Sequence, residues 1–241
     1  MSASRPSPLP ESLELEGEPL ERVHSYKNDW LSAVGRYRGA SLDVILKVYR
    51  QRPLFGVLPV AWITRRMARR EVELLRRFQE FDGVPRQFGT WNGTGLLHEF
   101  VEGHPLRRDE DVRPDFFELL RGLVGKIHEH GVAFVDLSKR DNVLVGPEGR
   151  PYLLDFQIAW AWPTDGIFGT VLPNFVGRAV LERLQRGDRH HVLKHQSRVQ
   201  PDSLTQDELE RLDNPGLLLR VHRKLLRPYQ KWRRRRQRAR A

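Results

Sequence analysis

The segment FVDLSKRDNVLVGPEGRPYLLDFQ, residues 134–157, places several side chains with oxygen donors, among them Asp136, Asn142 and Asp155, around two short apolar runs. Asp136 and Asn142 precede the first run, and Asp155 lies at the end of the second. The turn PEGR between the runs predicts a hairpin of two short strands, which would bring Asn142 and Asp155 together. Such donors suit Mg²⁺, which prefers oxygen ligands. The segment is therefore either an ordinary hairpin with polar ends or a site for metal and phosphate.

Transfer of a phosphoryl group from Mg-ATP needs only a few kinds of protein group. A carboxylate orients or deprotonates the acceptor, oxygen ligands hold the metal, and a cation holds the phosphates. Residues 134–157 contain carboxylates and an amide suited to the first two tasks. The segment is a candidate active-site loop, and motifs elsewhere in the chain must decide between the two interpretations.

In this segment the chain resembles the protein kinase-like superfamily, since VDLSKRDNVLV is similar to its catalytic loop and LLDFQ to its DFG segment. The resemblance implies that Asp136 is the catalytic base and that Lys139 is the loop cation near the γ-phosphate. It also implies that Asn142 and Asp155 are the ligands of Mg²⁺. The expected cofactors are therefore ATP and Mg²⁺, and the expected activity is that of a kinase with a hydroxyl acceptor.

Two motifs upstream resemble the lysine and the glutamate that hold the phosphates of ATP in this superfamily. VILKVYR, residues 44–50, implies Lys47 as the ligand of the α- and β-phosphates. A lone lysine is usually exposed, but the apolar neighbours of Lys47 favour a strand that faces inward. REVELLRRF, residues 70–78, implies Glu71 as the ion-pair partner of Lys47. Glu73 is the weaker choice, because it lies two residues round the helix.

The motif LLHEFVEGHPL, residues 96–106, resembles the hinge between the two lobes of the superfamily. The resemblance implies that backbone groups of Glu99 and Val101 bind adenine, with His98 at the gatekeeper position. All five motifs occur in the order of the superfamily, between residues 20 and 160. Their combination favours a nucleotide site over a set of unrelated polar loops.

The expected fold class is α+β, in the form of a two-lobed protein kinase-like fold. A five-stranded antiparallel sheet with one helix should form the first lobe, and an abbreviated set of helices the second. The expected divisions are a disordered leader (1–20), the first lobe with the hinge (21–103), the second lobe (104–227) and a basic tail (228–241). The leader is expected to be disordered because it is rich in Pro, Ser and Glu.

Local patterns support both lobes. WLSAV and DVILKVY are rich in β-forming residues, and GRYRGAS between them, residues 35–41, predicts a turn. Residues 61–81 have apolar residues at helical spacing. Residues 113–131 do so too, and Gly131 is expected to cap the second of these helices. The first half of the chain is thus expected to be rich in strands and the second half mainly helical.

The chain departs from the superfamily pattern at several positions. Five residues separate Asp136 from Asn142, where the superfamily has four. Residues 134–135 are Phe-Val instead of His-Arg, and Gln157 replaces the glycine of DFG. No glycine occurs in residues 25–30, where a phosphate-binding loop is expected. These departures resemble the small bacterial kinase-like proteins grouped with lipopolysaccharide core kinases and Rio-type kinases.

The net charge of +10 is concentrated at the end of the chain. Residues 220–241 contain eleven Lys and Arg and no acid, which leaves 30 basic and 31 acidic residues elsewhere. Basic amphipathic segments with an aromatic residue favour an anionic membrane surface, although nucleic acid or a solvated tail remains an alternative. The longest apolar run, residues 54–63, is about half of a membrane-spanning helix. The expected localisation is cytoplasmic, peripheral on the inner face of the cell membrane.

The acceptor is the least determined part of the expected function. A membrane-associated glycolipid or lipopolysaccharide-type sugar fits the basic tail and the compact second lobe. A protein Ser/Thr acceptor fits the fold, but no A-P-E segment follows the DFQ sequence. A small-molecule acceptor is also open. A pseudokinase scaffold is the alternative outside enzymes, favoured by the glycine-free loop and opposed by the retained residues Lys47, Asp136, Asn142 and Asp155.

Overall fold

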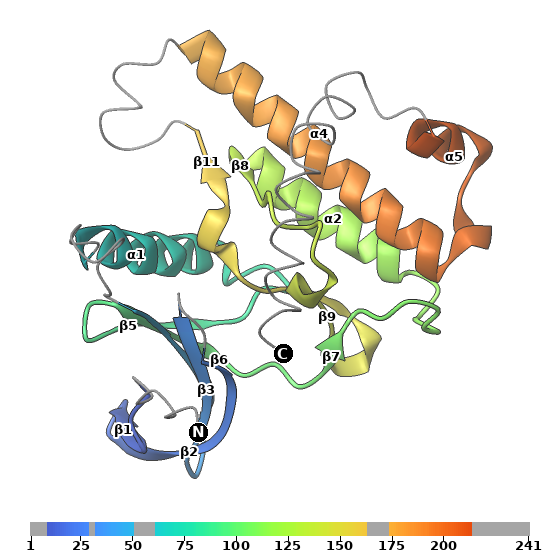
Figure 1. Cartoon of the computed structure of the whole chain (residues 1–241). Helices are drawn as coiled ribbons and strands as arrows, with labels where there is room; N and C mark the ends of the chain where they lie inside the picture. The colour runs from blue at the N-terminus through green and yellow to red at the C-terminus, as the bar shows by residue number, and fades with distance from the viewer. Residues whose placement is uncertain (1–8, 29–31, 51–60, 163–173, 214–241) are drawn as a thin grey trace, which may run out of the picture.

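The computed structural model describes residues 9–28, 32–50, 61–162 and 174–213, which form a sheet-rich lobe and a helical lobe (Figure 1). The first lobe contains β1 (Ser12–Leu15), β2 (Glu18–Asn28), β3 (Ser32–Arg38), β4 (Asp43–Tyr49), α1 (Ala61–Phe78), β5 (Gln87–Trp91) and β6 (Gly95–Glu99). Its strands form one antiparallel sheet in the order β1-β2-β3-β4-β6-β5. The two-lobed α+β fold expected from the sequence is confirmed, with α1 lying beside the curled sheet (Figure 1).

The sheet has six strands where five were expected, because the predicted leader is not disordered over its described part. Residues Ser12–Leu15 pair with Glu18–Glu21 in a hairpin whose turn residues, Glu16 and Gly17, both have positive φ. Leu13 and Leu20 face the core of the sheet and are buried there. These apolar residues outweigh the polar composition of the segment, so the leader prediction is wrong for residues 9–20.

Strand β3 extends further than the sequence indicated. The predicted turn over residues 35–41 is mostly strand, and the chain reverses only after Gly39, whose N–H donates to the carbonyl of Leu42 at 2.9 Å. Tyr37 is the reason, because its ring is fully buried in the sheet and its hydroxyl donates to the carbonyl of Pro10 at 2.7 Å. Burial of an aromatic ring is worth more than the turn preference of its neighbours.

Within the described ranges, the second lobe contains three helices and several short strands and 3₁₀ turns. Its elements are β7 (His104–Pro105), α2 (Phe116–Glu129), β8 (Val132–Ala133), a 3₁₀ turn (Arg140–Asn142), β9 (Val143–Val145), a 3₁₀ turn (Pro147–Gly149), β10 (Pro151–Leu153), a 3₁₀ turn (Phe156–Ile158), β11 (Trp160–Ala161), α4 (Asn174–Val199), a 3₁₀ turn (Pro201–Ser203) and α5 (Gln206–Asp213). The predicted hairpin is present as β9 paired with β10. Gly131 follows α2 with a φ of +71°, as a capping glycine does.

One hydrophobic core runs through both lobes. It contains Phe78 of α1, Leu120 of α2 and Phe156, which are fully buried. The ring of Phe156 lies 6.0 Å from that of Phe78 and 5.0 Å from that of Phe134. The segment after β10 is therefore anchored beneath α1, which places the preceding residue, Asp155, between the lobes.

The helices in the described ranges include none with a stretch apolar enough to cross a bilayer. The strongly basic segment 220–241 and the predicted tail 228–241 lie outside the described residues, as do residues 51–60. The expected surface interactions of these segments stay predictions.

Candidate functional site

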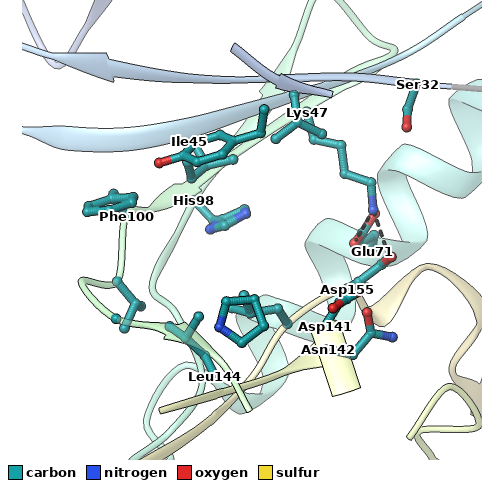
Figure 2. Close-up of a pocket in the computed structure, with 16 residues that line it drawn as sticks. Ser32, Ile45, Lys47, Glu71, His98, Phe100, Asp141, Asn142, Leu144 and Asp155 are labelled. Carbon is teal, nitrogen blue, oxygen red and sulfur yellow. Dashed lines mark hydrogen bonds and ion pairs between the residues drawn. The ribbon is translucent and has the colours of Figure 1, made fainter. Parts of the chain in front are cut away.

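A cavity of about 440 Å³ lies between the lobes and is lined by residues from both (Figure 2). Ile45, Lys47 and His98 project into it from the sheet, and Asn142, Leu144 and Asp155 come from the second lobe. The volume lies within the range of small-molecule and cofactor sites. Five of the eight predicted site residues line this one cavity: Lys47, Glu71, Val101, Asn142 and Asp155.

Lys47 joins the two lobes through an ion-pair triad. Its ammonium lies 2.9 Å from Oε1 of Glu71 on α1 and 2.8 Å from Oδ1 of Asp155 (Figure 2). Lys47 and Glu71 are only 8% and 2% exposed, so neither charge could be accommodated without the other. Glu73, the weaker partner suggested by the sequence, is exposed on the opposite side of the helix turn. The structure thus brings Lys47 and Glu71 together, with Asp155 completing the group.

Tyr49, two residues beyond Lys47 on β4, is a member of this site that the sequence analysis missed. Its hydroxyl forms a short hydrogen bond to Oε2 of Glu71. Burial raises the pKa of the Tyr49 hydroxyl, so the group stays protonated and acts as the donor. Strand alternation puts residues 47 and 49 on the same face of β4, which was the signal available in the sequence.

The charges of the triad shift the ionisation of each partner. Burial opposes the charged form of Lys47, but the carboxylates of Glu71 and Asp155 outweigh it and raise the pKa of the ammonium. Burial raises the pKa of Glu71, and the Lys47 charge offsets only part of that effect. Burial also acts to raise the pKa of Asp155, but Lys47 more than compensates, so the pKa of Asp155 is lowered. Lys47 is therefore a protonated, preorganised cation at the inner end of the cavity.

The loop after β8 carries Asp136, Lys139 and Asn142. The Lys139 ammonium pairs with Oδ2 of Asp136. The amide nitrogen of Asn142 donates to the backbone carbonyl of Asp136 at 3.1 Å, which leaves the amide oxygen of this cavity-lining residue as an acceptor. Asp155 lines the cavity with its side chain 34% exposed, and Lys47 engages its Oδ1 rather than its Oδ2. Asn142 and Asp155 thus offer two oxygen donors in one place, a set that fits Mg²⁺.

The backbone of this loop is held by Asp188, a residue of α4 that the sequence analysis did not identify. Its carboxylate accepts hydrogen bonds from the N–H groups of Phe134 at 2.7 Å and Val135 at 2.8 Å, and pairs with His128 at 3.0 Å. Val135 has a φ of +71°, a costly conformation for a β-branched residue. Asp188, 1% exposed, stabilises this conformation immediately before Asp136.

Two further residues of α4 hold the same loop. Gln185 donates to the carbonyls of His128 and Val132, and His195 contacts the carbonyl of Leu137 at 2.6 Å. The spacing of residues 185, 188 and 195 places them within one helix that lies beside α2 (Figure 1). The sequence of α4 is rich in charged residues throughout, so nothing in it distinguished these three polar residues from the exposed ones.

The hinge differs in one respect from the arrangement that the sequence indicated. Val101 lines the cavity, and the described residues include no hydrogen-bond partner for its backbone N–H. The carbonyl of Glu99, by contrast, already lies 2.8 Å from Nδ1 of His98. The ring of His98 itself points into the cavity (Figure 2).

The segment expected to approach the phosphates is only partly described. Ser25 and Asn28 lie on β2 and are exposed, and the amide oxygen of Asn28 accepts a hydrogen bond from Arg50. Residues 29–31 and the side chain of Lys27 lie outside the described parts of the chain. Tyr26 is the residue of this segment that lines the cavity. The role predicted for this segment stays a prediction.

Two solved structures with a similar fold are of a kinase. A complex of the Rio2 kinase from Chaetomium thermophilum with ADP/Mg²⁺ and phosphoaspartate superposes with a TM-score of 0.56 at 15% identity, over 80% of this chain and 62% of that one. Another structure of Rio2 kinase from the same organism gives a TM-score of 0.53 at 14% identity, over 87% of this chain and 74% of that one. The chain thus spans less than two thirds of the first of these structures. No protein-family model and no curated protein matches the chain in sequence.

These similarities confirm the protein kinase-like fold. At 14–15% identity they concern the fold alone. The chemistry must be argued from the residues of the cavity.

Proposed function

We propose that this protein is a phosphotransferase that moves the γ-phosphoryl group of Mg-ATP to a hydroxyl. The observation that carries the proposal is the convergence of Lys47, Glu71, Asp155 and Asn142 on one cavity between the lobes. A simple structural ion pair would not need a second carboxylate and an amide oxygen acceptor at the same place. The ADP/Mg²⁺ complex of the Rio2 kinase neighbour adds support, because that protein binds a nucleotide in the same fold.

In the proposed mechanism Lys47 binds the α- and β-phosphates, and Glu71 keeps its ammonium in position. Asp136 orients the acceptor hydroxyl and takes its proton as the oxygen–phosphorus bond forms and the bond to the β-phosphate oxygen breaks. Lys139 must leave Asp136 for the acceptor to approach, and its ammonium can then turn toward the transferred group. Positioning and charge compensation supply most of the rate.

The residues that would hold Mg²⁺ are Asn142, through its amide oxygen, and Asp155, through Oδ2. The lowered pKa of Asp155 favours the ionised form that binds a metal. When bound, the ion would neutralise charge on the phosphates. Lys47 would be drawn from Asp155 toward the nucleotide, so this ion pair of the triad is expected to weaken in the complex.

The acceptor that we propose is an anionic glycolipid or lipopolysaccharide-type sugar at the inner face of the cell membrane. Positive charge gathers beside the catalytic loop. Burial lowers the pKa of Arg198 at the end of α4, and the charges of Arg108 and Arg140 lower it further. Cations placed together in this way favour a phosphorylated or carboxylated acceptor over a neutral one. The basic segment 220–241 would add attraction to an anionic membrane.

A nucleotide-binding pseudokinase is the second candidate. Residues 25–30 lack the glycines that normally let a backbone approach the phosphates, and the catalytic loop is one residue longer than usual. Such a protein would bind ATP through Lys47 without transferring phosphate. The ion pair between Lys139 and Asp136 also suits this candidate, because it covers the carboxylate that would act as base.

Transfer of labelled γ-phosphate from Mg-ATP into a cell lysate, separated into lipid, protein and small-molecule fractions, tests the proposal. Label in the lipid fraction is expected, and Asp136→Asn should reduce it by at least about a hundredfold, the usual contribution of a general base. Asp202→Asn, at an exposed carboxylate in a 3₁₀ turn, is the matched control and should retain full activity. Label in protein would instead indicate a Ser/Thr kinase. No label dependent on Asp136 in any fraction would contradict transfer and favour the pseudokinase.

A further inference from the structure

His98 lines the cavity between the lobes, and its side chain has no role in the mechanism proposed above. His98 lies on β6 directly opposite Ile45 of β4 and next to the hinge. Its ring points into the cavity between Lys47 and Phe100 (Figure 2). A base bound under the hinge would have to place one of its edges against this ring.

The hydrogen bond between His98 and Glu99 determines which ring nitrogen carries the proton. Nδ1 of His98 lies 2.8 Å from the backbone oxygen of Glu99. A carbonyl oxygen can only accept, so Nδ1 must be the donor in this contact. Burial lowers the pKa of His98 to about 4, so the ring carries a single proton near neutral pH. Nε2 is then left without a hydrogen and is an acceptor.

This tautomer gives the inner edge of the cavity a defined pattern of acceptors and donors. Nε2 of His98 is an acceptor, the carbonyl of Glu99 keeps one lone pair, and the N–H of Val101 is a donor. Adenine presents an amino group at position 6 and an acceptor at N1, which complements this pattern. Guanine and hypoxanthine present a carbonyl at position 6 and an N–H at position 1. Their 6-carbonyl would face Nε2 of His98, and their N1–H would face the N–H of Val101, so acceptor would meet acceptor and donor would meet donor.

We infer that His98 is a specificity-determining residue of the nucleotide site, whose Nε2 accepts a hydrogen bond from the 6-amino group of adenine and thereby selects ATP over 6-oxopurine nucleotides. This inference rests on the proposed nucleotide-binding function. It adds a contact from a side chain to the contacts that the hinge backbone would make with adenine. A polar group that a bound base covers without offering it a partner penalises the wrong ligand, which is how a single hydrogen bond discriminates.

Calorimetric titration of the full chain with nucleoside diphosphates in the presence of Mg²⁺ tests the inference without depending on catalysis. Three ligands differ only at the purine edge: ADP, IDP, which has a 6-oxo group, and purine riboside diphosphate, which lacks any group at position 6. The unmodified protein should bind ADP about tenfold more tightly than purine riboside diphosphate, the worth of one well-placed hydrogen bond. IDP should bind more weakly still.

Two substitutions of His98 distinguish the effect of its hydrogen-bond acceptor from the effect of its ring shape. His98→Phe keeps a ring but no acceptor, and should bring ADP and purine riboside diphosphate to within about twofold of each other. His98→Gln keeps an amide oxygen and should retain the preference for ADP. Retention of the full preference in His98→Phe would overturn the inference and assign selection to the hinge backbone.

The outcomes also distinguish this inference from the proposed function. Tight binding of all three nucleotides without discrimination would overturn the role of His98 and leave the nucleotide site intact. Failure of the unmodified protein to bind any of the three would overturn both. Nitrogen-15 spectra of the histidine rings give an independent check, since Nε2 of His98 should show the shift of an unprotonated nitrogen that moves when ADP binds.

Discussion

The two sides of the cavity are stabilised in different ways. On the sheet side, Lys47, Glu71 and Tyr49 are held by opposite charges and a hydrogen bond between neighbouring regular elements. On the loop side, the segment before Asp136 has little regular structure and is held by Asp188, which comes from more than fifty residues further along the chain. The sheet side depends on charge balance, whereas the loop side depends on side chains that bind backbone groups.

This difference has consequences for stability and function. A charge pair between two rigid elements can be weakened by pH, because one partner can change its ionisation. On the loop side a single buried carboxylate, that of Asp188, accepts from two backbone N–H groups beside a residue with positive φ, so its loss leaves several groups unsatisfied at once. Substitutions on the loop side should therefore cost more than those on the sheet side.

The largest effect is expected for Asp188→Ala. The substitution leaves the buried N–H groups of Phe134 and Val135 without their acceptor, and it releases the strained φ of Val135. The free energy of unfolding should fall by about 4 kcal/mol, since each unsatisfied buried donor costs about 1–3 kcal/mol. Urea denaturation measures the stability, and phosphate transfer should fall by at least about a hundredfold.

The matched control for Asp188→Ala is Glu182→Ala, at an exposed carboxylate on the same helix. It should change the free energy of unfolding by no more than about 0.5 kcal/mol. A loss below about 1 kcal/mol for Asp188→Ala would show that the loop is held in place by packing alone, and the contrast between the two sides of the cavity would not stand.

The second effect in size is expected for Lys47→Met, and it should depend on pH. Without the lysine charge the pKa of Glu71 rises further above its ordinary value of 4.5, because nothing then offsets its burial. The folded variant keeps a proton on Glu71 that the unfolded chain releases, so its stability falls as pH rises toward the folded pKa. The loss relative to the unmodified protein should reach about 3 kcal/mol at pH 8 and be much smaller at pH 5.

Urea denaturation at several pH values between 5 and 8 measures this dependence. Lys126→Met, at an exposed lysine of α2, should show a small difference from the unmodified protein that does not vary with pH. A constant loss for Lys47→Met across the same range would mean that Glu71 does not take up a proton. Charge balance would then not be what stabilises the sheet side.

The smallest effect is expected for Tyr49→Phe. Loss of the hydroxyl removes one hydrogen bond to the Glu71 carboxylate and should cost about 1–2 kcal/mol of stability. Because Glu71 then orients Lys47 less well, the affinity for ADP should fall about threefold. Calorimetry and urea denaturation measure the two quantities.

Tyr37→Phe provides a matched control on the neighbouring strand. Tyr37 is also fully buried and donates one hydrogen bond, but its partner is the carbonyl of Pro10 rather than a residue of the cavity. Its loss should cost about 1 kcal/mol and leave the affinity for ADP unchanged. Equal effects of the two substitutions on affinity would remove Tyr49 from the site.

The sequence predicted the sheet side of the site better than the loop side, and the reason is local. Lys47 and Glu71 lie in motifs that resemble the lysine and glutamate motifs of the protein kinase-like superfamily, so their meeting could be anticipated from that resemblance. Val135 with positive φ could not, because a β-branched residue has no preference for that conformation and adopts it only when other groups impose it. The error over residues 9–20 had a similar cause, since their polar composition conceals a hairpin stabilised by Leu13 and Leu20.

By itself the sequence determined the order of the elements, the two-lobed α+β architecture, and the residues that supply charge and oxygen donors. The elements and the donor residues follow from hydrophobic periodicity and residue chemistry, which are properties of short segments. The two-lobed architecture follows from the resemblance of the motifs to the protein kinase-like superfamily. Tertiary structure alone decided that Asp188 holds the loop before Asp136, that Tyr49 completes the pair of Lys47 and Glu71, and that His98 presents an acceptor to the cavity. Each depends on a contact set by packing, because a side chain's hydrogen-bonding partner and tautomer are chosen only once its neighbours are in place.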